Sequence, residues 1–446
     1  MYLSKRWLEI ILNSFICLLF AVVVLIVEFD ISKIKILFFF NCFICAALIH
    51  KCSNYVPNFL IAVFMGLYVY FMYSFFILEI PYSYRVRFDL PVYHKTVLLI
   101  YAVFFLVLFL TLDGGKSTYD ISESIEIVNS PTRFFLAISA IVVITFFSKS
   151  GDNMLEAGSY SMVNTLKGIE TPEKGLNLFE YVLVFIPIAF KFSDTKTKRV
   201  ILIIAASMFG LKGLLYGGRI EMIQAFSMMM FLFMGKILER YRLLAIFLIV
   251  IGVYFAMLFG KIRNNPLFLG SMDDSFFNVW NTNSLIQITH HGDVFYASAR
   301  LVGMVEEGII DSITRMESFF VFWARLVVPV KYLPDYADLS SYLGSIYTTG
   351  GGGFVGAFFY VWLSYPGVIV IALLIGKLMN SVRREGLAEY QVMMLLIIIS
   401  TFPRWVAYYP INIFKMTLYA ILVYVIFNYQ NIMIRVSSSR PPQHSG

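Results

Sequence analysis

The sequence predicts an all-α polytopic membrane protein, with about twelve transmembrane helices and one long extramembrane loop that contains short helices. Three features of the 446 residues indicate this class: 59% of them are hydrophobic, only 14% are charged, and the mean hydropathy is +0.77. Soluble domains carry about 25% charged residues. Apolar runs of about 18–20 residues, the length that crosses a bilayer, recur along the chain.

Twelve apolar segments can be placed in order, with polar or glycine-containing turns between them. The seventh and eighth lie close together, but Gly217-Gly218 between them is a natural place for the chain to reverse. One continuous helix of that length would be too long for a bilayer. The expected spans are 8–28, 34–50, 56–80, 96–112, 133–147, 177–192, 199–215, 221–236, 243–260, 366–380, 388–403 and 408–428.

Basic residues predict the orientation, because cytoplasmic loops carry an excess of Lys and Arg. Lys5 and Arg6 precede the first span, and basic clusters follow the sixth, eighth, tenth and twelfth spans. These clusters place both termini in the cytoplasm. Two basic loops fall on the outer side. Either their charges are too few to change the orientation, or they face an anionic substrate. Their residues are Lys33 and Lys35 in the first loop, and Arg85, Arg87 and Lys95 in the second.

The spans divide the chain into three parts. Residues 1–260 are expected to form an N-terminal bundle of about nine helices, 261–364 the long outer loop and probable active-site region, and 365–446 the C-terminal helices with a cytoplasmic tail. Within the loop, helical spacing predicts a helix over 293–307. The apolar stretch 317–330 is too short to span, which favours an in-plane or re-entrant helix. The apolar stretch 353–363 either caps a pocket or extends the tenth span.

Arginine is the main indication of chemistry. A guanidinium can bind two phosphate oxygens at once, and six arginines besides Arg85 and Arg87 fall outside or at the outer boundary, in a chain with few other charges. As a set they favour an anionic lipid substrate. Each one alone can equally be an interfacial side chain that reaches for water or phospholipid. The six are Arg219, Arg263, Arg300, Arg315, Arg325 and Arg404.

The same loop contains the candidate general bases. His290 and His291 are followed by Asp293, and this histidine cluster can take a proton near neutral pH. Glu307, next to Glu306, is a further candidate. The alternative for each is a solvated loop or a helix end. A zinc site would need a third ligand at suitable spacing, and we expect neither a metal nor a cofactor.

Two other motifs are weaker. The run Gly350 to Gly353 lacks the Lys-Ser/Thr of a phosphate-binding P-loop, so it predicts a flexible hinge or a close approach of backbone to substrate. Cys42 and Cys45 have the spacing of a metal or redox pair, but they lie in an apolar run without a second pair. We interpret them as ordinary residues of a membrane helix.

The arrangement resembles a known family. It comprises twelve spans, a Gly217-Gly218-Arg219 turn between the seventh and eighth, and one long outer loop after the ninth. The stretch Leu343 to Tyr347 before the glycine run, and Arg404 before the last span, complete it. These features are similar to those of the O-antigen polymerases, which are integral-membrane polymerases of oligosaccharide repeat units in bacterial envelopes. The chain lacks a clean second copy of the Arg-to-Gly loop pattern described for some members.

The resemblance implies a function and a location. Such enzymes join polyprenyl-pyrophosphate-linked oligosaccharides on the periplasmic face of the inner membrane, and a chain-length regulator protein can be a partner. It implies pyrophosphate binding by Arg219, Arg300 and Arg404, with Arg263 and Arg325 as further candidates. His290, His291, Asp293 and Glu307 are then candidates for the base. An O-antigen ligase or a repeat-unit flippase is the alternative, and nucleic acid is not expected as a partner.

Overall fold

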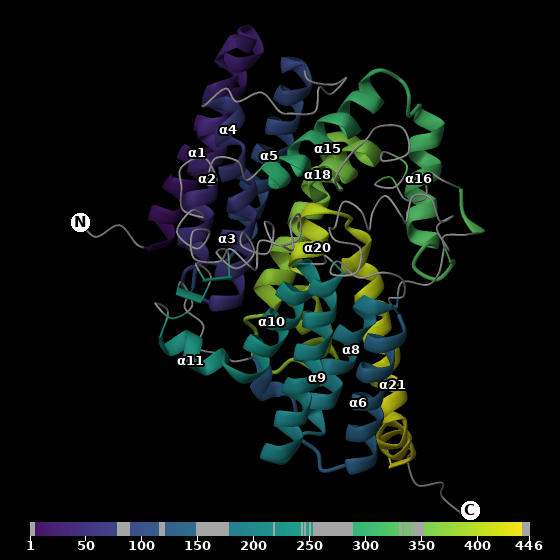
Figure 1. Ribbon diagram of the computed structural model, residues 1–446. Helices are drawn as coiled ribbons and strands as arrows, with labels where there is room; N and C mark the ends of the chain where they lie inside the picture. Colours follow the sequence, from purple (N-terminus) through teal and green to yellow (C-terminus); the bar gives the residue numbers. More distant parts are fainter. Residues whose placement is uncertain are drawn as a thin grey trace, which may run out of the picture. The chain divides into compact units, whose positions relative to one another are not determined.

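The computed structural model of the protein describes residues 5–77, 90–115, 121–148, 178–216, 219–241, 289–329 and 352–438, with isolated positions in 244–252 and 332–342. Every regular element in these ranges is a helix (Figure 1). The contacts divide the chain into two compact units. Unit 1 comprises 1–119, 237–384 and 402–411, and unit 2 comprises the remainder. Each unit contains residues from more than one of the three parts expected from the sequence. Those parts describe membrane topology, which stays a prediction.

Unit 1 is built from the first helices of the chain, the helices within and directly after the long loop 261–364, and a short helix near 405. Its elements are α1 (Lys5–Phe29), η1 (Ile31–Lys33), α2 (Ile34–Cys52), α3 (Val56–Phe71), α4 (Tyr73–Phe76), α5 (Pro91–Thr111), α15 (Thr289–Glu306), α16 (Ser312–Ala324), α18 (Val355–Ser381) and α20 (Phe402–Ala407). Unit 2 contains η2 (Ile121–Ser124), α6 (Pro131–Phe147), η3 (Phe179–Tyr181), α8 (Val182–Lys191), α9 (Lys196–Leu215), α10 (Arg219–Phe233), α19 (Glu389–Ser400) and α21 (Ile411–Ser438). The short α11 (Gly235–Arg240) lies at the boundary between the units.

Five helical segments are long and apolar enough to cross a membrane, which agrees with the membrane class expected from composition. They are Glu9–Phe29, Ile31–Cys52, Pro91–Thr111, Val355–Ser381 and Ile411–Tyr429. Shorter apolar helices occupy other positions where the sequence predicts spans, such as 56–70, 131–147, 220–233 and 389–400. The expected ninth span, 243–260, lies almost wholly outside the described residues.

The core of unit 1 forms around α5. This helix is apolar on every side, as is typical of a helix with neighbours all round. Its side chains Tyr101, Phe104 and Phe105 are completely buried, and α2, α15 and α18 pack against it. The one buried amide of α2, Asn41, donates its Nδ2 hydrogens to the carbonyls of Leu37 and Leu98. The side-chain amide of Asn41 therefore bridges α2 and α5.

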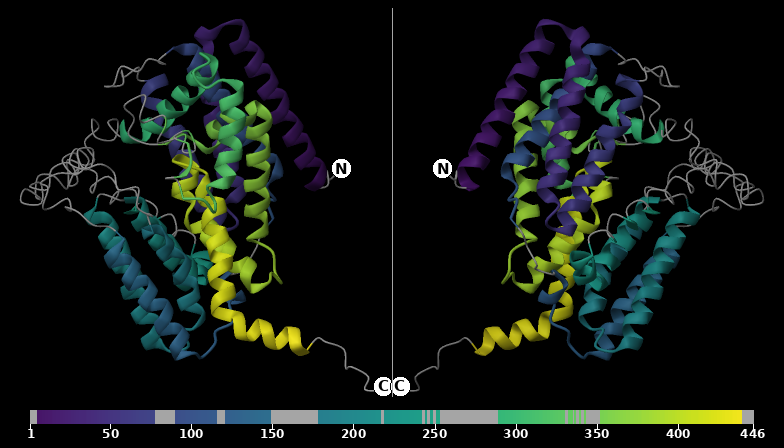
Figure 2. Two further views of the ribbon diagram at one scale, coloured as in Figure 1. Left: turned by 90° about the vertical axis from the view of Figure 1, so that its right-hand side faces the viewer. Right: turned by 90° about the vertical axis from the view of Figure 1, so that its left-hand side faces the viewer.

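Side chains from α3 cap the C-terminal end of α18. Asn58 donates to the carbonyl of Met379 at 3.0 Å, and the hydroxyl of Tyr55 donates to the carbonyl of Val382 at 3.1 Å. The last carbonyls of a helix have no partner within it, so these bonds satisfy groups that would otherwise be buried and unpaired. They fix the end of α18 within unit 1 (Figure 2 shows the unit from two sides).

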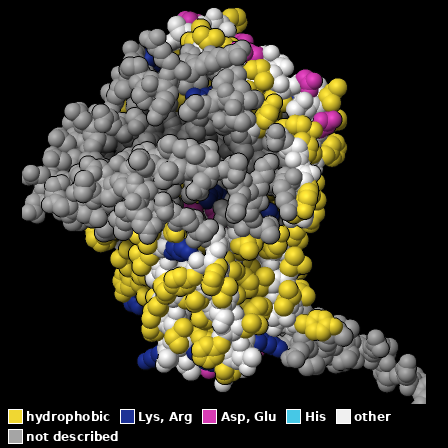
Figure 3. Space-filling view, turned by 45° about the vertical axis from the view of Figure 1, so that its right-hand side comes forward, with side chains coloured by type: hydrophobic (Ala, Val, Ile, Leu, Met, Phe, Trp, Pro, Cys, Tyr) yellow, Lys and Arg dark blue, Asp and Glu magenta, His cyan; other side chains and the backbone are white. Residues whose placement is uncertain are grey.

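In unit 2, α6, α8, α9, α10 and α19 pack on one another. A buried ion pair joins the ends of two of them: Lys191, only 3% exposed, contacts Glu389 Oε2, and the hydroxyl of Tyr424 donates to the same oxygen at 2.9 Å. Lys212 donates to the carbonyl of Phe146 in the last turn of α6, a position that favours a cation. Apolar side chains cover much of the visible surface of this unit (Figure 3), as expected for contact with lipid.

Candidate functional site

The helix α18 is broken at Ser364. This residue has φ 55° and ψ −149°, a conformation that residues with a side chain rarely adopt. Pro366 follows and has no backbone N–H to continue the helix. The chain turns back so sharply that a Cβ added at Gly367 would collide with the backbone of the preceding turns. Consequently, α18 consists of a half-helix over 355–363 and a longer segment over 365–381.

Packing against α5 supports the same conclusion. A Cβ at Gly356 would lie 3.1 Å from Ile100, and a Cβ at Gly376 would lie 2.7 Å from Thr111. A straight helix would separate the two glycines by about 30 Å, because each residue adds about 1.5 Å. Their partners on α5 are only about 17 Å apart by the same rule. The two segments of α18 therefore run in different directions over one face of α5.

Arg315 of α16 holds the break. Its Nε donates to the carbonyl of Val361, and its Nη2 donates to the hydroxyl of Ser364 at 3.0 Å and to the carbonyl of Tyr360 at 3.4 Å. Two of these acceptors are among the last carbonyls of the half-helix 355–363, which have lost their helical partners. A cation also suits the negative end of a helix dipole. The sequence groups Arg315 with the arginines expected to bind an anion. In the structure, its guanidinium donates instead to two backbone carbonyls and one hydroxyl at the end of the half-helix.

The other end of the half-helix lies halfway along α5. The ring of Phe354, the residue before the half-helix, stacks on Tyr101 with a centroid distance of 4.0 Å. The backbone N–H of Phe354 donates to the hydroxyl of Ser298 on α15 at 2.9 Å. A Cβ at Gly353 would lie 3.2 Å from the same hydroxyl. This part of the glycine run closely approaches a helix of the protein itself.

Two of the predicted arginines lie at the start of this half-helix. A Cβ at Gly352 would collide with the carbonyl of Tyr408, so the glycine run and the end of α20 are in direct backbone contact. The guanidinium of Arg404 lies 5.6 Å from the centroid of the Tyr408 ring, and that of Arg325 lies 4.9 Å from the centroid of Tyr409. We call these five residues the Gly352 junction. Residues far apart in the sequence thus bring two cations to consecutive tyrosines, the first of which contacts the glycine that precedes the half-helix. The N-terminal end of a helix itself favours anions.

Arg300 is close in sequence to Ser298, which contacts Gly353, but it lies on another side of α15. It is 5% exposed and lies on α15, two residues after Ser298. Two residues correspond to about 200° around a helix, so Arg300 lies on the side of α15 away from the one that contacts Gly353. The structure therefore groups Arg325 with Arg404 and separates Arg300 from the backbone contact.

The carboxylates at the end of α15 bind the first turns of α5. Tyr93 donates its hydroxyl to Glu307 at 3.0 Å, and Thr96 donates to Glu306 at 3.2 Å. Burial raises the pKa of the Glu306 carboxyl, while the hydroxyl of Thr96 and the charge of Lys95 oppose that shift. A carboxyl with a raised pKa is better suited to proton transfer near neutral pH. The sequence favoured Glu307 and not Glu306 as a candidate base, because the burial of Glu306 depends on α5, about two hundred residues earlier.

The remaining acid–base candidates lie at the opposite end of α15. His290, His291 and Asp293 are in its first turns, but their side chains are outside the described part of the chain. Ser298 is eight residues from His290 and eight from Glu306, which is about 12 Å in each direction along the helix. The histidines and the glutamates therefore lie towards opposite ends of α15, too far apart to act together on one substrate atom. Ser298 lies about midway between them.

Two predicted arginines are not placed. Arg263 lies outside the described residues, and α10 begins at Arg219, whose side chain is also outside the description. Among the described residues, no three His, Cys, Asp or Glu side chains form a group that could hold a metal ion. The free thiols of Cys42 and Cys45 belong to the apolar helix α2, the former partly and the latter fully buried.

Comparison with known proteins adds no assignment: no family model, curated protein or solved structure matches the chain.

Proposed function

We propose that the protein is a membrane glycosyltransferase that polymerises oligosaccharide repeat units carried on polyprenyl pyrophosphate. The observation that carries the proposal is the Gly352 junction, where Arg325 and Arg404 lie on consecutive tyrosines beside the start of a half-helix. Departure of a pyrophosphate develops negative charge, and pre-placed cations and helix N-termini stabilise such charge. The product would be an O-antigen or capsule-type polysaccharide.

The proposal assigns roles to the predicted residues. Arg404 and Arg325 bind the pyrophosphate at the junction, and Arg300, Arg219 and Arg263 are further candidates for that role. A hydroxyl of one repeat unit attacks the anomeric carbon of the other, the bond from that carbon to the pyrophosphate oxygen breaks, and a base takes the hydroxyl proton. The base is one of His290, His291, Asp293, Glu306 and Glu307.

The topology belongs to the same proposal. Twelve spans in the inner membrane, with both termini in the cytoplasm, would place 261–364 in the periplasm, where lipid-linked glycans are polymerised. Tags after Arg199, Arg240 and Arg384 are expected to report cytoplasm, and a tag near Asp311 is expected to report periplasm. A cytoplasmic report at Asp311 would contradict both the topology and the site.

Substitution of Arg404 tests the site. In a polymer-deficient strain, Arg404→Lys keeps the charge but loses the planar fork, so we expect shortened glycan ladders. Arg404→Ala should leave single repeat units on the lipid anchor at unchanged protein level. Arg240→Ala is a matched control, because Arg240 is exposed and remote in sequence from the junction. Full ladders from both Arg404 variants would rule out a role in pyrophosphate binding.

The deletion phenotype separates the enzyme classes. Loss of a polymerase leaves single repeat units attached to the anchor, whereas loss of a ligase leaves none. A second candidate, a transporter of lipid-linked repeat units, is favoured by one feature: the broken helix α18, since discontinuous helices are typical of transporter binding sites. Its deletion would leave no attached units and would retain lipid-linked units on the cytoplasmic side.

A further inference from the structure

Large apolar side chains form an exposed stripe along α16. Ile313, Met316 and Phe320, with Val327 in the turn that follows, are each 63–72% exposed, and Trp323 is 37% exposed. Their spacing of three and four residues places them on one side of a helix. An unbroken stripe of this kind marks a surface that contacts another apolar phase or a partner.

The opposite side of α16 is fixed to the half-helix 355–363. Arg315 caps the end of that half-helix, and Ser318 accepts a hydrogen bond from Trp362 Nε1 at 3.0 Å. The ring of Phe322 lies 4.5 Å from the ring of Trp362. Rolling α16 inwards to bury the stripe would break these contacts, so the stripe faces outwards as part of the fold.

The exposed side of α18 indicates which phase contacts the stripe on α16. The longer segment of α18 exposes Ile369, Val370 and Leu373 on one side, and it begins directly after Ser364, which Arg315 contacts. The longer segment is apolar and corresponds to the expected span 366–380, so its exposed side is expected to face lipid. The contact of Arg315 with Ser364, directly before this segment, places α16 beside the start of that span.

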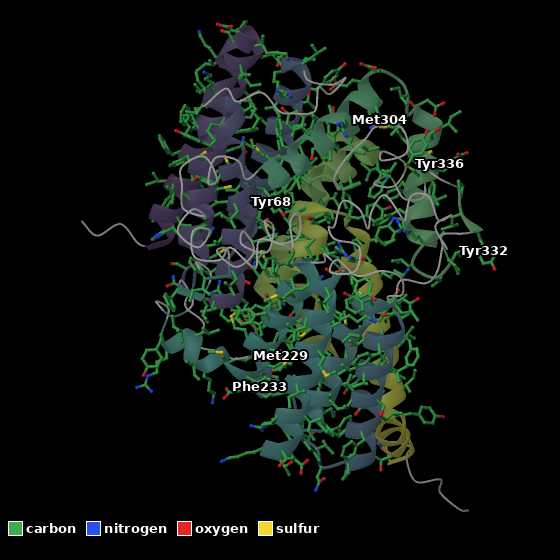
Figure 4. All side chains as sticks on the ribbon, viewed as in Figure 1. Tyr68, Met229, Phe233, Met304, Tyr332 and Tyr336 are labelled. Atoms are coloured by element: carbon green, nitrogen blue, oxygen red, sulfur yellow. The ribbon has the colours of Figure 1, made fainter. Side chains whose placement is uncertain are left out.

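The length and composition of α16 determine how it meets the lipid. Thirteen residues extend about 20 Å, which is too short for a hydrocarbon core of about 30 Å. Trp323 and the exposed Tyr332 are residue types that prefer the bilayer surface, and Tyr332 lies at the outer edge of the unit in Figure 4. We propose that the stripe of α16 contacts the acyl chains of bilayer phospholipid. This contact is independent of the catalytic activity.

Site-specific photocrosslinking of the full-length protein tests the contact. A benzophenone amino acid replaces Ile313, Phe320 or Val327 in turn, and the protein is reconstituted in phosphatidylcholine vesicles and irradiated. Mass spectrometry then identifies the adducts. Val370 on α18 is the positive control, and Glu385, which is exposed in the loop after α18, is the control for water. These exposed positions tolerate a bulky group, since their side chains fill no core.

We expect phosphatidylcholine adducts from all three stripe positions, as from Val370, and none from Glu385. Adducts to a second copy of the chain, or to a co-purified protein, would show that the stripe is a protein interface and would overturn the proposal. The absence of any adduct at the stripe, with lipid adducts at Val370, would place the stripe in water and overturn it as well.

Discussion

Replacing Arg315 with Met is expected to release α16 and the half-helix 355–363 from each other while leaving the apolar core intact. Two hydrogen bonds are well placed, those to the carbonyl of Val361 and to the hydroxyl of Ser364, whereas the contact with Tyr360 at 3.4 Å is near the limit. Taking about 1.5 kcal/mol for each bond to a charged group, the low end for a half-buried side chain, the loss is about 3 kcal/mol.

Hydrogen–deuterium exchange in detergent measures this loss locally. Since about 1.4 kcal/mol is a factor of ten, amides over 312–325 and 355–363 should exchange about 100-fold faster in Arg315→Met, with α5 unaffected. Arg315→Lys should give an intermediate value, because an ammonium cannot reach both acceptors with the same geometry. Arg384→Met, at an exposed position beyond α18, is the control. Wild-type exchange in both segments of Arg315→Met would refute the capping role.

Three further predictions concern other groups. Lys191→Met should destabilise unit 2 by about 3–5 kcal/mol, because it leaves the carboxylate of Glu389 buried without its cation, and the double variant with Glu389→Gln should recover most of that loss in a thermal assay. Because the pKa of Glu306 is raised in the folded protein, this group stabilises the fold at low pH, and that contribution is lost as the pH rises through the raised pKa. If Glu306 is the base, activity should rise over the same pH range, and Glu306→Gln should abolish that rise. Ala at both His290 and His291 should leave expression unchanged and reduce the polymerisation rate by about 10²–10⁴-fold if they supply the base, and a normal glycan ladder would assign them to a solvated helix end.

The positions of the helices could be predicted from the sequence, because they depend on local composition. Eleven of the twelve apolar segments coincide with described helices, and the other, 243–260, lies almost wholly outside them. A helix over 293–307 agrees closely with α15, and the short apolar helix expected over 317–330 overlaps α16, which begins five residues earlier. The earlier start is explained by Asp311, whose carboxylate accepts from the N–H of Thr314 as an N-cap.

The roles of individual arginines could not be predicted in this way. Arg315 and Arg325 are ten residues apart on one segment with similar surroundings in sequence, yet the first caps a helix end and the second lies over Tyr409. The difference depends on partners about 50 and 84 residues later in the chain. The sequence left open whether 353–363 caps a pocket or extends the tenth span, because a proline such as Pro366 does not by itself give the direction of the chain. That direction is determined by Arg315 and by the glycines that contact α5.

The strained break also bears on where the reaction should be sought. Backbone conformations such as that of Ser364 cost about 1–3 kcal/mol and persist when the surroundings enforce them, most often near functional sites. Here the break allows a half-helix to begin midway along α5, with its N-terminal end at the Gly352 junction. A straight α18 could not place Gly356 against Ile100 while keeping the contact of Gly376 with Thr111. If the proposed function is correct, the junction is therefore the first place to test for pyrophosphate binding, and the base is at whichever end of α15 the glycan would reach.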